Sequence, residues 1–186
     1  TSRRQRQMCI RDSYPTAELF INGKSYGKQS KNNSSLKSRY RLMWMDAVYE
    51  PGEVKVVAYN KDGKAVAEKT VRTAGKPHHI ELVSNRNELT ADGKDLAYIT
   101  VKVVDKDGNL CPADSRQINF SVKGAGKYRA AANGDPTNLE QFHLPKMHTF
   151  NGMLTAIVQS GETAGEIVLT AKASGVKAGN IRIQTK

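Results

Sequence analysis

The sequence is poor in residues that membrane, disulfide-rich and metal-binding proteins need. Its 186 residues include two cysteines, four histidines and one tryptophan. No segment approaches the roughly 18 consecutive apolar residues of a membrane-spanning helix, so the sequence predicts no membrane span. The start is rich in arginine with no apolar stretch behind it, and we expect no signal peptide there. Cys9 and Cys111 lack the spacing of a disulfide framework or zinc knuckle. We expect both thiols to be free, with Cys111 a small buried hydrophobe.

Acidic residues are scarce relative to basic ones, and the excess of basic residues is uneven. The formal net charge is +11. Residues 1–41 hold ten Lys and Arg against two Asp and Glu, whereas the remaining residues hold 19 against 16. A nucleic-acid module places its basic residues on a folded face, with aromatics interleaved for stacking. Here the excess lies in a terminal stretch and a Ser/Asn/Lys-rich loop. We therefore expect no nucleic-acid partner.

Turn signals divide the chain into four segments. Residues 1–13, TSRRQRQMCIRDS, have no strand or helix pattern, and MCIRDS resembles a translated sequencing adaptor. We interpret them as a non-native or disordered tail, with a natural basic arm as the alternative. Residues 14–74 form the first predicted domain, which opens on an Asn22-Gly23 hairpin. Residues 75–77 are a compact linker, because Gly and Pro close together interrupt strands. Residues 78–186 form the second predicted domain.

The strand pattern predicts an all-β protein. No stretch has sustained helical periodicity. Short apolar strands alternate with turns, as in β-sandwiches. VKVVAYNKDGK and VKVVDKDGN each lead a strand into a Lys-Asp-Gly turn, which suggests two similar modules. We predict two tandem immunoglobulin-like β-sandwiches. Trp44 lies between two methionines in a strand, which favours a core position over a sugar-stacking platform.

No candidate metal or cofactor site is complete in the sequence. Asp105 begins a stretch like a calcium loop, but the twelfth position is Arg116 instead of Glu. His78 and His79 are expected on opposite faces of a strand, where they could not share a metal. His143 and His148 lack the third and fourth ligands that zinc needs. We therefore expect no metal and no cofactor.

Catalytic motifs are also lacking. The chain has no Gly-x-Ser-x-Gly elbow and no evident Cys/His pair. Asp135 and Glu140 could in principle form the carboxylate pair of a glycosidase. However, both lie in one loop, and loop carboxylates without a rigid cleft are poorly positioned. We expect no catalytic residue in this chain.

Two long segments resemble a known family. AELFINGKSYGK followed by YEPGEVKVVAYNKDGKAVAEKTVRTAGKP resembles the immunoglobulin-like domain behind the catalytic barrel of many bacterial glycoside hydrolase family 2 enzymes, mostly β-galactosidases. The stretch from ELTADGKDLAYITVKVV to VLTAKASGV is similar to a further C-terminal domain of those enzymes. The likeness covers residues 14–186 and implies a truncated fragment, because the two catalytic glutamates of the family lie on the barrel. It also implies a missing N-terminal edge strand in the first sandwich, and hence a less stable first module.

The loop 133–152 is the candidate functional segment. Its pattern NGDPT…E…F…FNG matches the resembled family at Asn133, Asp135, Glu140, Phe142 and Asn151, among other positions. We expect Phe142 and Phe150 to hold it by packing, and we expect it to dock on the barrel or border the active site.

The resemblance therefore predicts a non-catalytic accessory region of a β-galactosidase-like glycosidase. Its partner would be the catalytic barrel, and its location periplasmic or secreted. A carbohydrate-binding or adhesin-like surface module is the alternative, since sandwiches host many functions.

Overall fold

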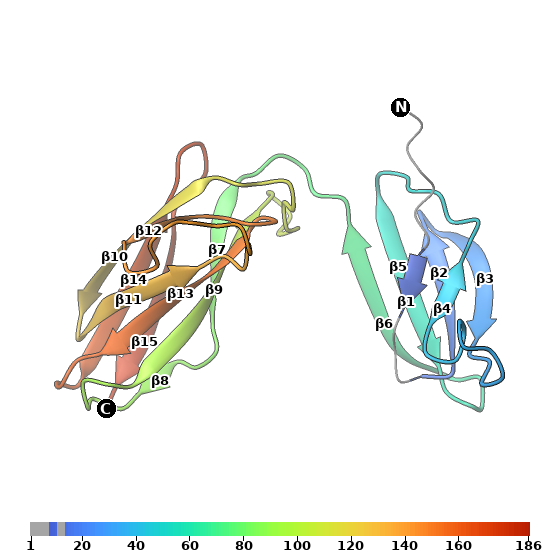
Figure 1. Ribbon diagram of the computed structural model, residues 1–186, viewed down its shortest axis with the longest axis horizontal. Coiled ribbons are helices and arrows are strands. Elements are labelled where there is room, and N and C mark those ends of the chain that lie inside the picture. The colour runs from blue at the N-terminus through green and yellow to red at the C-terminus, as the bar shows by residue number, and fades with distance from the viewer. Residues whose placement is uncertain (1–7, 11–13) are drawn as a thin grey trace. The chain divides into compact units, whose positions relative to one another are not determined.

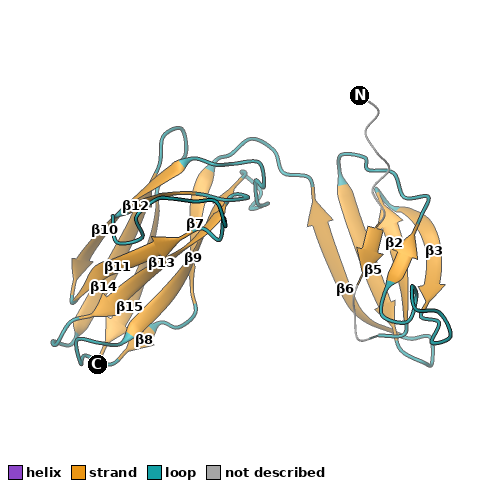
Figure 2. Ribbon diagram, in the orientation of Figure 1, coloured by secondary structure: helices purple, strands orange, loops and turns teal. Residues whose placement is uncertain are grey.

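The computed structural model of the protein describes residues 8–10 and 14–186. It contains strands, turns and loops, and none of the described residues is helical (Figure 2). The chain divides into two compact units, of which the first ends at Thr73 and the second is Ala74–Lys186. The all-β prediction is confirmed. Each unit buries its own apolar cluster, in a layered arrangement that is compatible with immunoglobulin-like domains.

The described residues of the first unit form two sheets. Its strands are β1 (Met8–Ile10), β2 (Thr16–Ile21), β3 (Lys24–Ser30), β4 (Leu42–Trp44), β5 (Glu53–Tyr59) and β6 (Ala65–Arg72). One antiparallel sheet has the order β3-β2-β5-β6, and β1 pairs with β4 in the other (Figure 1). Asn22 and Gly23 have φ values of 49° and 81°, which confirms the predicted Asn-Gly hairpin between β2 and β3.

The core of the first unit lies between β2 and β4. Residues of β2 alternate between half-buried and buried, so Ala17, Leu19 and Ile21 face inward. They pack with Leu42 and Trp44 of β4. The indole Nε1 of Trp44 donates to the Gly27 carbonyl oxygen at 2.8 Å, so the one tryptophan is buried with its polar atom satisfied. The predicted core position of Trp44 is confirmed.

Strand β1 corrects the interpretation of residues 1–13 as a tail without structure. Met8, Cys9 and Ile10 pair antiparallel with Trp44, Met43 and Leu42. A three-residue strand is too short to show a period in the sequence, and its pairing depends on a partner far along the chain. The same strand corrects the expectation that the first sandwich has no strand before residue 14. The rest of the expected tail, residues 1–7 and 11–13, lies outside the described residues.

The second sheet of the first unit is nevertheless narrow. Strand β4 lies against β2 and β3, whereas seven of the eight residues of β6 are exposed. Val71 of β6 pairs with Val54 of β5 on the inward side, yet Val71 is exposed. The inner face of β5 and β6 is therefore only partly covered.

The second unit is a fuller sandwich. Its strands are β7 (His79–Ser84), β8 (Glu88–Leu89), β9 (Leu96–Val104), β10 (Gln117–Gly124), β11 (Gly126–Ala132), β12 (Lys146–His148), β13 (Met153–Ser160), β14 (Gly165–Lys172) and β15 (Gly179–Thr185). One sheet has the order β12-β10-β14-β15-β8 and the other β11-β13-β9-β7 (Figure 1). Strand β8 runs parallel to β15, and all other strand pairs of this unit are antiparallel.

The core of the second unit comes from alternate residues of both sheets. Ile99 and Val101 of β9 and Leu169 of β14 are fully buried, together with many neighbours from β13 and β10. Cys111 belongs to the same cluster, as predicted, and burial raises the pKa of its thiol. The two outer faces of this sandwich, by contrast, differ strongly in composition.

Candidate functional site: the loop between β11 and β13

The loop 133–152 is built by hydrogen bonds among its own residues. The Asn133 side-chain oxygen accepts from the Asp135 backbone N–H at 3.0 Å, and its Nδ2 donates to the His148 carbonyl at 3.0 Å. The Asp135 carboxylate accepts from the backbone N–H and the hydroxyl of Thr137 at 2.9 and 2.8 Å. Asn151 adopts a φ of 53° at the turn into β13. Three predicted site residues thus shape the loop itself.

Glu140 is paired with His148, which the sequence analysis did not foresee. The carboxylate accepts from the His148 backbone N–H at 3.0 Å and lies 2.9 Å from its ring Nδ1. Burial raises the pKa of Glu140, but the hydrogen bonds from His148 outweigh it and hold the pKa below the ordinary 4.5. Glu140 therefore stays ionised at neutral pH and accepts a hydrogen bond from a backbone N–H of the short strand β12.

The loop also closes one side of the sandwich by covering an edge of each sheet. At the edge of one sheet, the Ala131 N–H donates to the Phe142 carbonyl at 2.8 Å, and the Tyr128 hydroxyl donates to the Leu144 carbonyl at 2.7 Å. At the edge of the other sheet, β12 pairs with β10. Unpaired strand edges invite association with other chains. The length of this loop thus has a structural use.

Neither phenylalanine side chain is buried, contrary to the prediction that both hold the loop by packing. Phe142 is 56% exposed and Phe150 is 40% exposed. Met147 fills the role instead, since its side chain is fully buried in the core cluster. The pattern failed here because an aromatic residue in a loop can face either way, and only the pairing of β12 with β10 decides which side chain points inward. Leu139, at 96% exposure, is the most exposed apolar residue of the loop.

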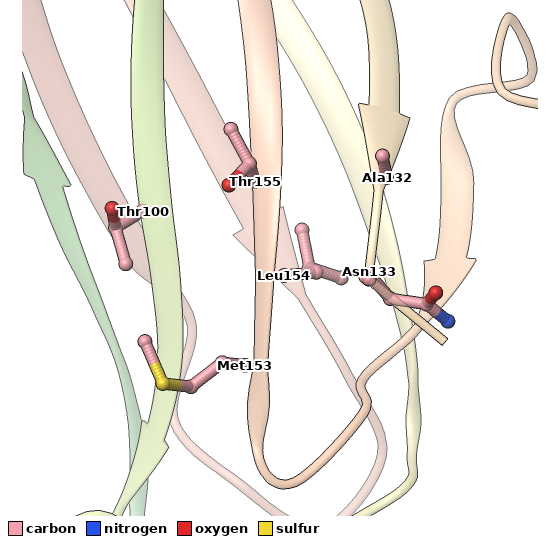
Figure 3. A pocket seen from close by; sticks show the side chains of 7 residues that line it. Thr100, Ala132, Asn133, Met153, Leu154 and Thr155 are labelled. Carbon is pink, nitrogen blue, oxygen red and sulfur yellow. The ribbon is translucent and has the colours of Figure 1, made fainter. Parts of the chain in front are cut away.

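Two surface depressions lie beside the loop, on the outer face of the sheet β11-β13-β9-β7. One, of about 430 Å³, is lined by Thr100, Ala132, Asn133, Gly134, Met153, Leu154 and Thr155 (Figure 3). The other, of about 630 Å³, is lined by Leu96, Arg129, Ala130, Leu139, Glu140, Gln141, Phe142, His143 and Ile157. Asn133 therefore borders the first depression, and Glu140 and Phe142 border the second. Asp135 and Asn151 line neither.

The remaining sequence candidates have structural roles. Asp105 is 2% exposed, and its carboxylate accepts from the backbone N–H groups of Gly75, Asp107 and Asn109 at 2.8 to 2.9 Å. These hydrogen bonds, with that from Gly75 the strongest influence, hold its pKa well below the ordinary 3.8. The carboxylate thus ties the segment before β7 to the hairpin after β9.

His78 and His79 contradict the expectation that they face apart. Their Nδ1 atoms lie 3.0 Å from each other. The alternation of a strand does not apply, because β7 begins at His79 and His78 precedes it. Within residues 8–10 and 14–186, no three His, Cys, Asp or Glu side chains come together as they would around a metal ion. In the same part of the chain, no helix is long and apolar enough to cross a membrane.

Comparison with known proteins identifies the second unit. Residues 80–182 match the family described as glycoside hydrolase family 2 C-terminal domain 5, and residues 9–67 match a domain of unknown function (DUF4982). Since the first match covers more than half of the chain, the chain belongs to the glycoside hydrolase family 2 C-terminal domain family. The second match begins at Cys9, so part of the segment interpreted as a foreign tail lies within a recognised domain.

The relatives are much longer glycosidases. The chain is 39% identical over 178 residues to Beta-galactosidase BoGH2A of Bacteroides ovatus, a match that covers 96% of this chain and 20% of the relative. It is 32% identical to a Beta-galactosidase of Thermoanaerobacter pseudethanolicus, with 91% and 22% covered. A crystal structure of a glycosyl hydrolase family 2 member from Bacteroides cellulosilyticus superposes with a TM-score of 0.85 at 32% identity, over 100% of this chain and 24% of that one. The chain therefore spans about a fifth of the length of the curated relatives it matches.

Proposed function

We propose that this chain is a non-catalytic accessory region of a family 2 glycoside hydrolase, a hydrolase of O-glycosyl bonds in a β-galactoside or related sugar. The observation that carries the proposal is the match of the second unit to a C-terminal domain of this family. The hydrogen bonding of the loop supports it, because Asp135 is engaged by Thr137 and Glu140 by His148. Neither carboxylate is thus held free for acid–base work at a sugar. The catalytic carboxylates belong to the catalytic barrel, the proposed partner.

The loop 133–152 is proposed to border the active site of that barrel. Its exposed Leu139 and Phe142 and the neighbouring depression support this role, since they offer a contact surface on a firmly hydrogen-bonded support. The depression also favours a second candidate function, direct carbohydrate binding. Phe142 could stack on an apolar sugar face there, with Arg129 and Gln141 as hydrogen-bond donors.

The test compares the 186-residue chain, the full-length parent enzyme and the parent lacking this region, on chromogenic β-galactosides and β-glucuronides. We expect no turnover by the chain alone, and a lower melting temperature or activity of the parent without it. In the full-length enzyme, Asp135→Ala and Glu140→Ala should change KM or melting temperature, whereas the exposed Asp62→Ala in the first unit should change neither.

Turnover by the isolated chain that is lost on Glu140→Ala would overturn the non-catalytic assignment. A deletion that leaves both activity and melting temperature unchanged would overturn the accessory role. Retention of the isolated chain on immobilised polysaccharide, lost on Phe142→Ala, would favour the carbohydrate-binding alternative.

A further inference from the structure

The two outer faces of the second unit have opposite character. On the sheet β12-β10-β14-β15-β8, the outward positions of the three long strands are mostly polar, and four of eleven are charged: Gln117, Asn119, Ser121, Lys123, Glu166, Val168, Thr170, Lys172, Asn180, Arg182 and Gln184. This is the composition expected of a sheet face in contact with water. It provides an internal reference for the other face of the same sandwich.

The outer face of the sheet β11-β13-β9-β7 lacks charge across its centre. Strand register places two rows there, one of Val83, Thr100, Thr155 and Ala132 and one of Tyr98, Ile157 and Ala130. Met153 continues this surface beside Thr155. We call these eight residues the uncharged face. The nearest outward charged residues of β7 and β9, Glu81 and Lys102, pair with each other at 3.5 Å at its border.

The exposed tip of the loop 133–152 extends this surface. Leu139 and Phe142 line one depression together with Ala130 and Ile157 of the uncharged face. Two charged residues, Arg129 and Glu140, also line this depression, and Glu140 is paired with His148. Thr100, Thr155 and Ala132 line the adjacent depression, on three neighbouring strands (Figure 3). Of the five large apolar residues that are exposed in Ala74–Lys186, four lie on this combined surface: Val83, Tyr98, Leu139 and Phe142. Contiguous exposed apolar surface of this kind marks an interaction site.

We propose that the uncharged face, with Leu139 and Phe142, is the surface through which this region packs on the catalytic part of its parent enzyme, an inference that rests on the proposed function. The partner surface is uncharged and predominantly apolar. The absence of charge on eight central positions fits a permanent interface, in which charged residues are depleted at the core. We assign this face to the catalytic part of the parent enzyme because about four fifths of the length of the relatives lies outside the matched region. The charged opposite face stays in water.

Cysteine labelling tests the proposal with a matched control. Ala132→Cys places a thiol on the uncharged face, and Ser121→Cys places one at an exposed position of the opposite face. Each variant carries Cys9→Ser, and Cys111 serves as a slow internal reference because it is buried. The rate of modification by N-ethylmaleimide is measured by mass spectrometry in the 186-residue chain and in the full-length enzyme. Tyr98→Cys is a second probe on the same face, in case the Ala132 variant fails to fold.

We expect the modification rate of the Ala132→Cys thiol to differ between the chain alone and the full-length enzyme, and that of the control thiol to stay the same. Modification of the Ala132→Cys thiol should be at least about tenfold slower in the full-length enzyme than in the chain alone, while the Ser121→Cys rates agree within about twofold, because only exposed thiolates react. Equal rates at Ala132→Cys and Tyr98→Cys in both proteins would overturn the proposal. Slowing that vanishes on dilution and accompanies a dimer would assign the face to a second copy and would also overturn it.

The result separates this inference from the proposed function. If deletion of the region destabilises or inactivates the parent while both probes on the uncharged face stay reactive, the accessory role stands and the docking face is wrong. If deletion has no effect at all, the accessory role itself fails.

Discussion

At the scale of single residues, Asp105 stands out because it is the buried charged side chain among the described residues. It is almost fully buried and accepts three backbone hydrogen bonds. Asp105→Asn retains the shape but loses the charge, and its amide NH2 meets donors instead of acceptors. Since hydrogen bonds to charged groups are stronger than neutral ones, we expect the melting temperature of the second unit to fall by about 5 °C at pH 7. Differential scanning calorimetry measures this, with the exposed Asp107→Asn as control.

The same carboxylate predicts a pH dependence with a definite sign. Because folding lowers the pKa of Asp105 below 3.8, its contribution is fully present above that value and is lost as the pH falls further toward the folded pKa. The difference in melting temperature between the wild type and Asp105→Asn should therefore shrink below about pH 4. A difference that stays constant down to about pH 2 would show that the charge of Asp105 does not stabilise the fold.

At the scale of elements, the hydroxyl of Tyr128 joins β11 to the loop that covers it. It donates to the carbonyls of Leu144 and Phe142 at 2.7 and 3.3 Å, and burial raises the pKa of Tyr128 to about 12. Tyr128→Phe should cost about 1 kcal/mol of unfolding free energy and speed amide exchange around residues 142–144. The exposed Tyr98→Phe is the control. Unchanged exchange in that segment would mean that the backbone pairing alone holds the loop.

The elements also show how far sequence reasoning reached. Local chemistry predicted the Asn22-Gly23 hairpin and the all-β class, and residue type predicted the burial of Trp44 and Cys111. The pairing of β1 with β4 and the insertion of Met147 into the core depend on distant partners, so no local pattern signals them. The uncharged face did leave a signal in the sequence. Alternate positions of the segments that form β9 and β13 carry no charge over several residues, although 25% of the chain is charged.

At the scale of the whole molecule, the two units differ in the size of their cores. Among described side chains, the first unit buries six apolar residues in its cluster and the second buries eighteen. The expectation of a less stable first module stays a prediction. We expect amide protection factors in β2 and β5 at least about tenfold lower than in β9 and β13, since protection in a core strand reports the opening free energy of its unit. Hydrogen exchange with mass spectrometry on the 186-residue chain measures both units at once, and comparable protection would refute the prediction.

The loop 133–152 covers an edge of both sheets of the second unit, and this limits which changes of its length the fold can tolerate. Deleting residues from this loop would expose the backbone edges of both β11 and β10. Because unpaired strand edges associate with other chains, a shortened variant should self-associate before it unfolds. Lengthening it at Leu139 touches neither ladder and adds little closure entropy. Related sequences should therefore tolerate insertions at Leu139, whereas deletions in the loop should be poorly tolerated.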